Sequence, residues 1–168
     1  MHFGFRIFAH GNPALSGLGS QTRAAVLQLL LWTCALGFAA AARAESQDFG
    51  NYTVHYIAVN TTFLSPDIAE EYNIVRSDRR AFLNIAVIRN NADGSTTPVE
   101  ATVMGSKSNL LQQSDAIAFD EIREGDAVYY IGQFDFSNAE NMRFSVSVQP
   151  ERKGPAHEIE WTTQLYAD

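Results

Sequence analysis

Residues 122–136 constrain the fold more than any other part of the chain. They open with the turn sequence Arg-Glu-Gly-Asp at 123–126 and continue as an apolar and aromatic run around Val128, Tyr129 and Tyr130. Large apolar side chains fall at odd and even positions, so neither face of a strand formed here would be polar. A short run of this kind after a glycine turn is typical of a central strand in a packed sheet.

The first 44 residues have the pattern of an export signal. An apolar run at 24–40 follows Arg6 and Arg23, precedes Ala42-Arg43-Ala44, and no acidic residue occurs before Glu45. A basic start, an apolar centre and a small-x-small site predict a cleavable signal peptide over 1–44, with cleavage after Ala44 and a periplasmic mature protein. The alternative is an uncleaved anchor, but the run is shorter than the ~20 residues that span a bilayer. We therefore expect no stable membrane insertion after cleavage.

The mature part, residues 45–168, has the length of one domain. Cys34 is the only cysteine and lies in the predicted signal, so we expect no disulfide, thiolate metal site or cysteine nucleophile after cleavage. Nine basic against nineteen acidic residues give the mature part a formal charge of −10. This charge disfavours nucleic acid and anionic lipid as partners, although it is also explained by solubility alone.

Alternating or doubly apolar runs predict about seven strands. They lie at 52–59, 82–89, 97–105, 116–122, 127–136, 142–148 and 157–166. One short helix is predicted at 65–72, with Ser65 as its cap and Pro66 at its first position. Residues 45–51 are polar and are expected to be frayed. Because strands and helices do not alternate, we predict an all-β, antiparallel, immunoglobulin-like β-sandwich rather than a parallel sheet.

The sequence shows few marks of catalysis. It has no phosphate-binding glycine loop and no Gly-x-Ser-x-Gly elbow. His55 and His157 both fall inside predicted strands, where an ordinary structural role explains them. Together with Met104 and Met142 they are residue types that suit copper, but no metal-binding spacing supports such a site. We predict no catalytic residue, no metal site and no cofactor.

Two charged segments are candidate binding sites. Arg76, Arg79 and Arg80 form a basic island on an acidic chain, which is explained either by internal pairing with acidic loops or by contact with an acidic partner or anionic ligand. The second segment is the turn that precedes the central strand. Its candidate residues are Arg123, Glu124 and Asp126. The turn also resembles the corner before strand F of immunoglobulin-like folds, where a tyrosine hydroxyl bonds back to the chain.

Several short segments together resemble one family. They are residues 52–56 (Tyr-Thr-Val-His-Tyr), 62–66 (Thr-Phe-Leu-Ser-Pro), the 123–126 turn, 143–144 with 148–150, and 163–166 (Thr-Gln-Leu-Tyr). The chain is similar across nearly all of its mature part to domain-of-unknown-function family 4426, a set of small bacterial exported proteins. The resemblance implies a periplasmic β-rich domain and brings no activity, cofactor or catalytic residue with it.

These observations favour a non-enzymatic binding or accessory module with an envelope protein as its partner. One alternative is a hydrolase-like periplasmic enzyme with a loop site near Arg123 and Asp126, which requires His55 or His157 to lie against Asp126 or Glu124. A third interpretation is a purely structural envelope domain.

Overall fold

The computed structural model describes residues 45–167. The predicted signal peptide over 1–44, including Cys34, lies outside the described residues. The strands are β1 (Glu45–Phe49), β2 (Tyr52–Asn60), β3 (Arg80–Asn90), β4 (Thr96–Pro98), β5 (Ala101–Ser108), β6 (Ser114–Ile117), β7 (Asp120–Glu124), β8 (Ala127–Asp135), β9 (Glu140–Pro150) and β10 (His157–Leu165). A 3₁₀ turn, η2 (Thr61–Phe63), and one short helix, α2 (Pro66–Glu71), follow β2.

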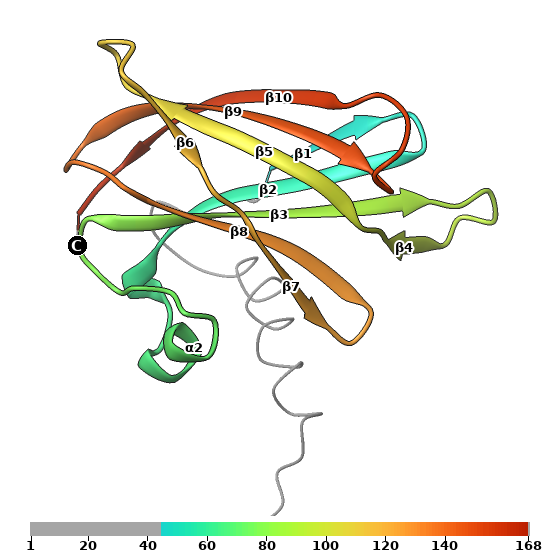
Figure 1. The fold of residues 1–168 in the computed structure, drawn as a ribbon, viewed down its shortest axis with the longest axis horizontal. Helices are drawn as coiled ribbons and strands as arrows, with labels where there is room; N and C mark the ends of the chain where they lie inside the picture. Colours follow the sequence, from blue (N-terminus) through green and yellow to red (C-terminus); the bar gives the residue numbers. More distant parts are fainter. Residues whose placement is uncertain (1–44, 168) are drawn as a thin grey trace, which may run out of the picture. The chain divides into compact units, whose positions relative to one another are not determined.

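The strands form two antiparallel sheets that face each other, as Figure 1 shows. The six-stranded sheet has the order β1-β2-β3-β8-β7, with β4 paired to the last residues of β3. The four-stranded sheet has the order β10-β9-β5-β6. The predicted antiparallel β-sandwich is confirmed. The strand β8 lies between β3 and β7, which makes it the central strand that its apolar sequence predicts.

The core lies between the two sheets. On β9 buried side chains alternate with partly or fully exposed ones, and the buried ones are Met142, Phe144, Val146, Val148 and Pro150. Phe144 is fully buried. Its ring centroid lies 5.1 Å from that of Phe134 on β8 and 5.0 Å from that of Trp161 on β10. Aromatic side chains bury large areas, so this cluster joins the two sheets through the middle of the domain.

Two predicted strands each divide into two, because the chain crosses from one sheet to the other within them. The strand predicted at 97–105 becomes β4 in the six-stranded sheet and β5 in the four-stranded sheet. The strand predicted at 116–122 becomes β6 in the four-stranded sheet and β7 in the six-stranded sheet. Residues on both sides of each crossing keep an extended conformation, so their local pattern does not reveal the change of sheet.

The crossing between β6 and β7 packs directly on Gly132 of β8. A Cβ atom at this position would lie 2.4 Å from Ile117 Cγ2 and 2.9 Å from Phe119 Cε1. Real Cβ atoms do not approach other atoms so closely, so only glycine leaves room for the crossing strand. This contact closes one side of the sandwich.

Residues 45–49 correct one expectation. They were expected to be frayed, but they form β1, which pairs in register with β2 from Glu45 opposite Tyr56 to Phe49 opposite Tyr52. The Phe49 ring stacks on His157 of β10 with 4.5 Å between ring centroids. Four of the five β1 side chains are exposed, which explains why this segment is polar. The strand is held by backbone pairing and by one ring contact, and neither is visible in the composition.

The helix α2 has the predicted start and packs on the outer face of the six-stranded sheet. The Ser65 hydroxyl accepts a hydrogen bond from Ile68 N (3.4 Å), and Pro66 occupies the first helical turn. Its buried residue is Ala69, which clusters with Leu64 and with Phe82 of β3. Neither helix of the described part is long and apolar enough to cross a membrane.

Candidate functional site

The candidate site lies at one of the two ends of the sandwich. At this end β2, β5, β8 and β10 finish and β3, β6 and β9 begin, together with η2, α2, the segment 75–80, the hairpin tip 109–113 and the loop 136–139. We call it the pocket end. It is on the left in Figure 1, and the opposite end, with the turns at 50–51, 91–95, 125–126 and 151–156, is on the right. We call that one the network end.

A buried hydroxyl fixes the basic segment at the pocket end. Thr61 of η2 has no exposed surface. Its Oγ1 accepts a hydrogen bond from Ser77 N (2.9 Å) and lies 3.1 Å from Ser77 O and 3.0 Å from Arg80 O, to which it donates. A buried hydroxyl has to be paired, and here one group satisfies backbone atoms at both ends of the segment 77–80. The loop that carries the arginines is therefore held against η2.

The three arginines of the basic island differ in their partners. Arg80 pairs with Asp135, with Nε and Oδ1 2.8 Å apart, and this hydrogen bond lowers the pKa of Asp135. Arg76 donates only to a backbone oxygen, Thr62 O, at 3.1 Å. Arg79 is exposed, and its guanidinium makes no ion pair or hydrogen bond with any described residue. Internal pairing thus explains Arg80 but not the other two.

Exposed apolar side chains gather at the same end. Of the six large apolar residues that are well exposed in the described part, five belong to the pocket end. They are Phe63, Val75, Leu110, Leu111 and Tyr166. Leu110 and Leu111 form the tip of the β5–β6 hairpin and are 79% and 80% exposed. The sixth, Met104, is on β5 away from this end. Single exposed apolar residues are ordinary, but a group of them at one end is a mark of contact surfaces.

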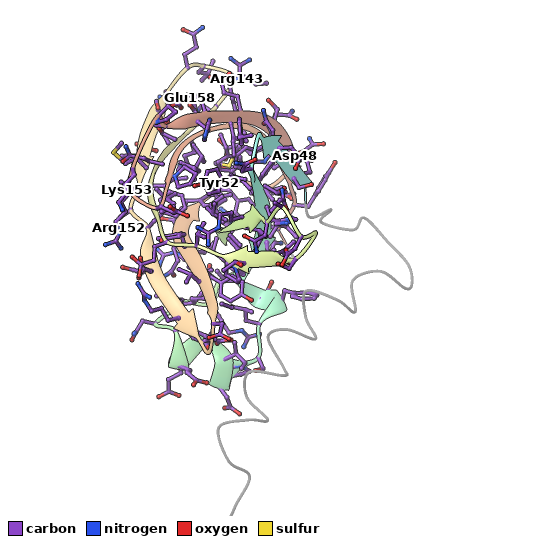
Figure 2. All side chains as sticks on the ribbon, turned by 90° about the vertical axis from the view of Figure 1, so that its right-hand side faces the viewer. Asp48, Tyr52, Arg143, Arg152, Lys153 and Glu158 are labelled. Atoms are coloured by element: carbon purple, nitrogen blue, oxygen red, sulfur yellow. The ribbon has the colours of Figure 1, made fainter. Side chains whose placement is uncertain are left out.

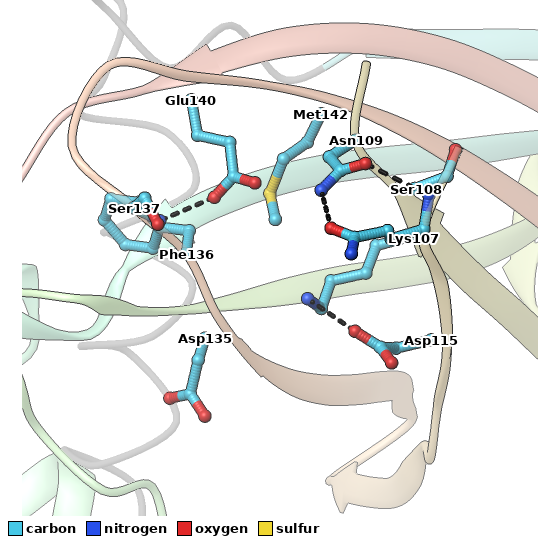
Figure 3. A pocket seen from close by; sticks show the side chains of 10 residues that line it. Lys107, Ser108, Asn109, Asp115, Asp135, Phe136, Ser137, Glu140 and Met142 are labelled. Atoms are coloured by element: carbon cyan, nitrogen blue, oxygen red, sulfur yellow. Dashed lines mark hydrogen bonds and ion pairs between the residues drawn. The ribbon is translucent and has the colours of Figure 1, made fainter. Parts of the chain in front are cut away.

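An open pocket lies between the β5–β6 hairpin and the loop after β8, as Figure 3 shows. Its volume is 330 Å³. Its lining is Lys107, Ser108, Asn109, Gln113, Asp115, Asp135, Phe136, Ser137, Glu140 and Met142. Lys107 Nζ lies 3.1 Å from Asp115 Oδ2, and Glu140 Oε2 accepts from Ser137 N at 2.6 Å. Most of the charged groups here already have partners within the chain, so the pocket offers a shaped polar wall and no exposed nucleophile–base pair.

The network end carries paired charges instead. The Arg123 guanidinium lies between two carboxylates, binding Glu100 and also Glu121, with Nε and Oε1 2.8 Å apart. Arg152 completes the group at 2.8 Å from Glu121 Oε2. Burial opposes the charge on Glu121, but the hydrogen bonds from Arg123 and Tyr130 outweigh it, so its pKa is lowered. Figure 2 looks onto this end, with Arg152 and the neighbouring Lys153 labelled.

A tyrosine hydroxyl connects this network to the fold. Tyr130 Oη accepts a hydrogen bond from Ala101 N (2.7 Å) and donates to Glu121 Oε2 (3.0 Å). It therefore joins β8 and β7 of one sheet to the first residue of β5 in the other. The 123–126 turn was compared with the tyrosine corner of immunoglobulin-like folds, and the tyrosine after this turn whose hydroxyl bonds back to the chain is Tyr130. The Tyr129 side chain points to the outer face of the six-stranded sheet. It is buried there, and this burial raises the pKa of its hydroxyl.

The three candidates of the 123–126 turn do not form one site. Successive side chains of a strand point to opposite faces of the sheet. The Glu124 side chain therefore points away from that of Arg123, to the outer face of the six-stranded sheet. There burial, and then the charge of Glu71, raise its pKa. Asp126 is exposed in the turn. In the sheet, Arg80 lies opposite Asp135 of β8 and Arg123 lies opposite Val128 of β8. The two candidate segments are therefore roughly seven strand residues, or about 23 Å, apart along β8.

The histidines do not meet the carboxylates that the enzyme alternative requires. His55 is exposed on β2, three strand spacings or about 14 Å from Glu124 on β7. His157 stacks on Phe49 at the opposite edge of the sandwich from β7. Met142 is in the core while Met104 is exposed on the outer surface. Within residues 45–167 no group of three or more His, Cys, Asp or Glu side chains is placed to hold a metal ion.

Three features of the pocket end do not follow from the sequence analysis. The pocket unites residues 107–115 with 135–142, and nothing in the sequence indicates that these segments meet. The exposed pair Leu110-Leu111 does have a signal, since two leucines inside a polar turn between strands cannot both enter a core. The role of Thr61 has no signal in the sequence, because threonine occurs both at buried and at exposed positions.

Taken together, these observations define a small antiparallel β-sandwich domain with a candidate binding surface at one end. A family model described as Domain of unknown function (DUF4426) matches residues 46–168, and the chain belongs to this family. The resemblance drawn from the sequence is thereby confirmed.

Solved structures show the same fold. A crystal structure of a DUF4426 family protein from Pseudomonas aeruginosa PAO1 has 29% sequence identity and a TM-score of 0.65, covering 74% of this chain and 96% of that one. FetP of uropathogenic Escherichia coli strain F11, expressed in the periplasm, has 10% identity and a TM-score of 0.56, covering 78% and 99%. A copper-bound variant of the same FetP has 9% identity and a TM-score of 0.53, covering 74% and 95%. No match was found among curated protein sequences.

Proposed function

We propose that this chain is an exported, periplasmic binding or accessory module without catalytic activity, and that it contacts an envelope protein through its pocket end. The observation that carries the proposal is the gathering of five exposed large apolar side chains at one end of the sandwich, together with two arginines that have no acidic partner among residues 45–167. The signal-like first 44 residues support export, and the structurally similar FetP was recombinantly expressed in the periplasm, which agrees with this location.

The chemistry of the pocket end favours contact with another protein over catalysis. Removal of apolar surface from water contributes about 25 cal/mol per Å², so exposed leucines and aromatic rings stabilise a complex that covers them. Loops at the ends of a sandwich are also the parts that a rigid scaffold presents to partners. The separation of His55 from Glu124 counts against the hydrolase-like alternative.

Photo-crosslinking in living cells tests the proposal. A photoreactive amino acid replaces Leu111 or Arg79 at the pocket end, and Met104 or Asp126 serves as the matched exposed control elsewhere. We expect a discrete, saturable protein adduct from the pocket-end positions and none from the controls, with mass spectrometry identifying the second protein. The absence of adducts at both pocket-end positions, in a processed and folded protein, would overturn the proposal. Equal labelling at all four positions would do the same.

A further inference from the structure

One part of the pocket end brings together three segments that carry exposed basic and apolar side chains. Arg76 Nη2 binds Thr62 O, which places its guanidinium beside the peptide of Phe63. Asn60 Nδ2 donates to Tyr166 O at 2.8 Å, which brings the end of the described chain to the same 3₁₀ turn. We call Phe63, Val75, Arg76, Arg79 and Tyr166 the basic–apolar surface. Its side chains come from three separate segments that hydrogen bonds hold together.

The segment that carries Val75 and both arginines is fixed in place. Gln133 of β8 bonds to it twice, accepting from Val75 N (2.9 Å) and donating to Asn73 O (3.0 Å). The buried Thr61 hydroxyl bonds to Ser77 a few residues further on. A surface that is already ordered loses little conformational entropy when it is covered, which favours binding.

The charge of this surface is opposite to that of the chain. Nineteen acidic residues surround nine basic ones in residues 45–168. Five of these basic residues, Arg80, Arg89, Lys107, Arg123 and Arg152, form ion pairs within the domain. The other four, Arg76, Arg79, Arg143 and Lys153, form no ion pair with any residue of 45–167. Of these four, Arg76 and Arg79 lie close together in one segment, three residues apart.

We infer that the basic–apolar surface binds an acidic polypeptide segment that also carries an apolar or aromatic side chain. Carboxylates of the segment would pair with Arg76 and Arg79, while its apolar group would cover Phe63 and Val75. Arginine suits this task because its planar guanidinium pairs with a carboxylate through two parallel hydrogen bonds. This inference rests on the proposed function and adds the chemical class of the partner segment and the residues that recognise it.

Peptide binding to the protein purified from the periplasm tests the inference. The probe is a fluorescent peptide of alternating glutamate with leucine and phenylalanine. One comparison peptide has lysine in place of glutamate, and a second has alanine in place of the apolar residues. We expect the acidic–apolar peptide to bind best, and its affinity to fall at least tenfold when salt is raised from about 50 mM to about 0.5 M, because exposed charge pairs are screened.

Charge variants locate the contact. Arg79→Glu should weaken binding by roughly tenfold or more, whereas Arg79→Lys, which keeps the charge, should lose less. Lys153→Glu makes the same change of charge at the network end and is the matched control (Figure 2). Equal losses for Arg79→Glu and Lys153→Glu would show a general field effect and overturn the inference. So would the absence of binding by the acidic–apolar peptide.

The crosslinking result separates this inference from the proposed function. If Leu111 still yields its adduct in cells while the acidic–apolar peptide fails and Arg79→Glu changes nothing, the inference is wrong and the proposed function stands. If neither pocket-end position yields an adduct, the proposed function itself is wrong. Binding to phosphatidylglycerol vesicles in preference to the peptide, or sedimentation as a dimer that Arg79→Glu dissolves, would replace the acidic partner segment and overturn the inference.

Discussion

The two ends of the sandwich use charge in opposite ways. At the network end Arg123 and Arg152 bind Glu100 and Glu121, and the hydroxyl of Tyr130 attaches this group to both sheets. At the pocket end Arg76 and Arg79 form no ion pair with a described residue, and exposed apolar side chains belong to the same end. The same residue types are thus structural at one end and available at the other.

The difference shows why a count of charged residues in the sequence is a poor guide to binding. Both candidate segments contain arginine close to acidic residues, and both were reasonable binding sites before their partners were known. The Arg123 guanidinium is satisfied by two carboxylates, Glu121 on its own strand and Glu100 on a distant segment. Arg79 projects from a loop whose backbone, and not its guanidinium, makes the local hydrogen bonds. Availability of the side chain, and not its charge, separates the two ends.

The largest expected effect comes from the strand that connects the two ends. Gly132→Ala places a Cβ atom within 2.4 Å of Ile117 Cγ2, so β6 or β8 has to shift. Overpacking of this kind costs about 1–3 kcal/mol of unfolding free energy, which urea unfolding measures. The double variant Gly132→Ala, Ile117→Ala removes the nearer of the two clashing side chains, leaving Phe119, and should be less destabilised than the sum of its single variants. Simple additivity would contradict the contact.

At the network end, Tyr130→Phe should cost about 1–3 kcal/mol, because the buried Ala101 N–H loses its acceptor. Tyr166→Phe at the pocket end removes a hydroxyl that bonds only to exposed Gln164 and is the matched control. We expect that control to change the unfolding free energy by less than about 0.5 kcal/mol. Similar values for both variants in denaturant unfolding would mean that Tyr130 does not connect the sheets.

At the pocket end, Thr61→Val should cost about 1–2 kcal/mol, since Ser77 N–H loses its acceptor and the one hydroxyl hydrogen shared by the carbonyls of Ser77 and Arg80 is removed. Thr61→Ser keeps the hydroxyl and should recover most of the loss. Hydrogen exchange at Ser77 reports on the same contact and should accelerate in the valine variant alone. Unchanged exchange would show that the basic segment is held by other means.

The smallest expected effect is a pH dependence at the network end. The folded protein lowers the pKa of Glu121 below its usual value of 4.5, so its contribution to stability is fully present above pH 4.5 and is lost as pH falls through the folded pKa. Glu121→Gln should therefore be less stable at neutral pH by about 0.2–1 kcal/mol, a small value because the pairs are near solvent. The difference from the unsubstituted protein should vanish in acid. A constant difference at all pH values would exclude charge as its origin.

The sequence by itself determined the class of the fold and several local details. Alternating and doubly apolar runs placed the strands, and the apolar run after the 123–126 turn became the central strand β8. Ser65 and Pro66 marked the start of α2 because capping depends on neighbouring residues only. The acidic charge and the position of Cys34 are also read directly from the sequence.

The tertiary structure decided the rest. Whether an extended segment stays in one sheet or crosses to the other depends on what lies opposite, and Gly132 leaves the space that lets β6 continue into β7. The state of each arginine was decided in the same way. The ion-pair partners are distant in sequence, as for Glu100, Arg152 and Asp135. Only folding therefore shows which arginine side chains form ion pairs within the domain. A local pattern contains no information about such partners, because they are brought close only when the two sheets pack against each other.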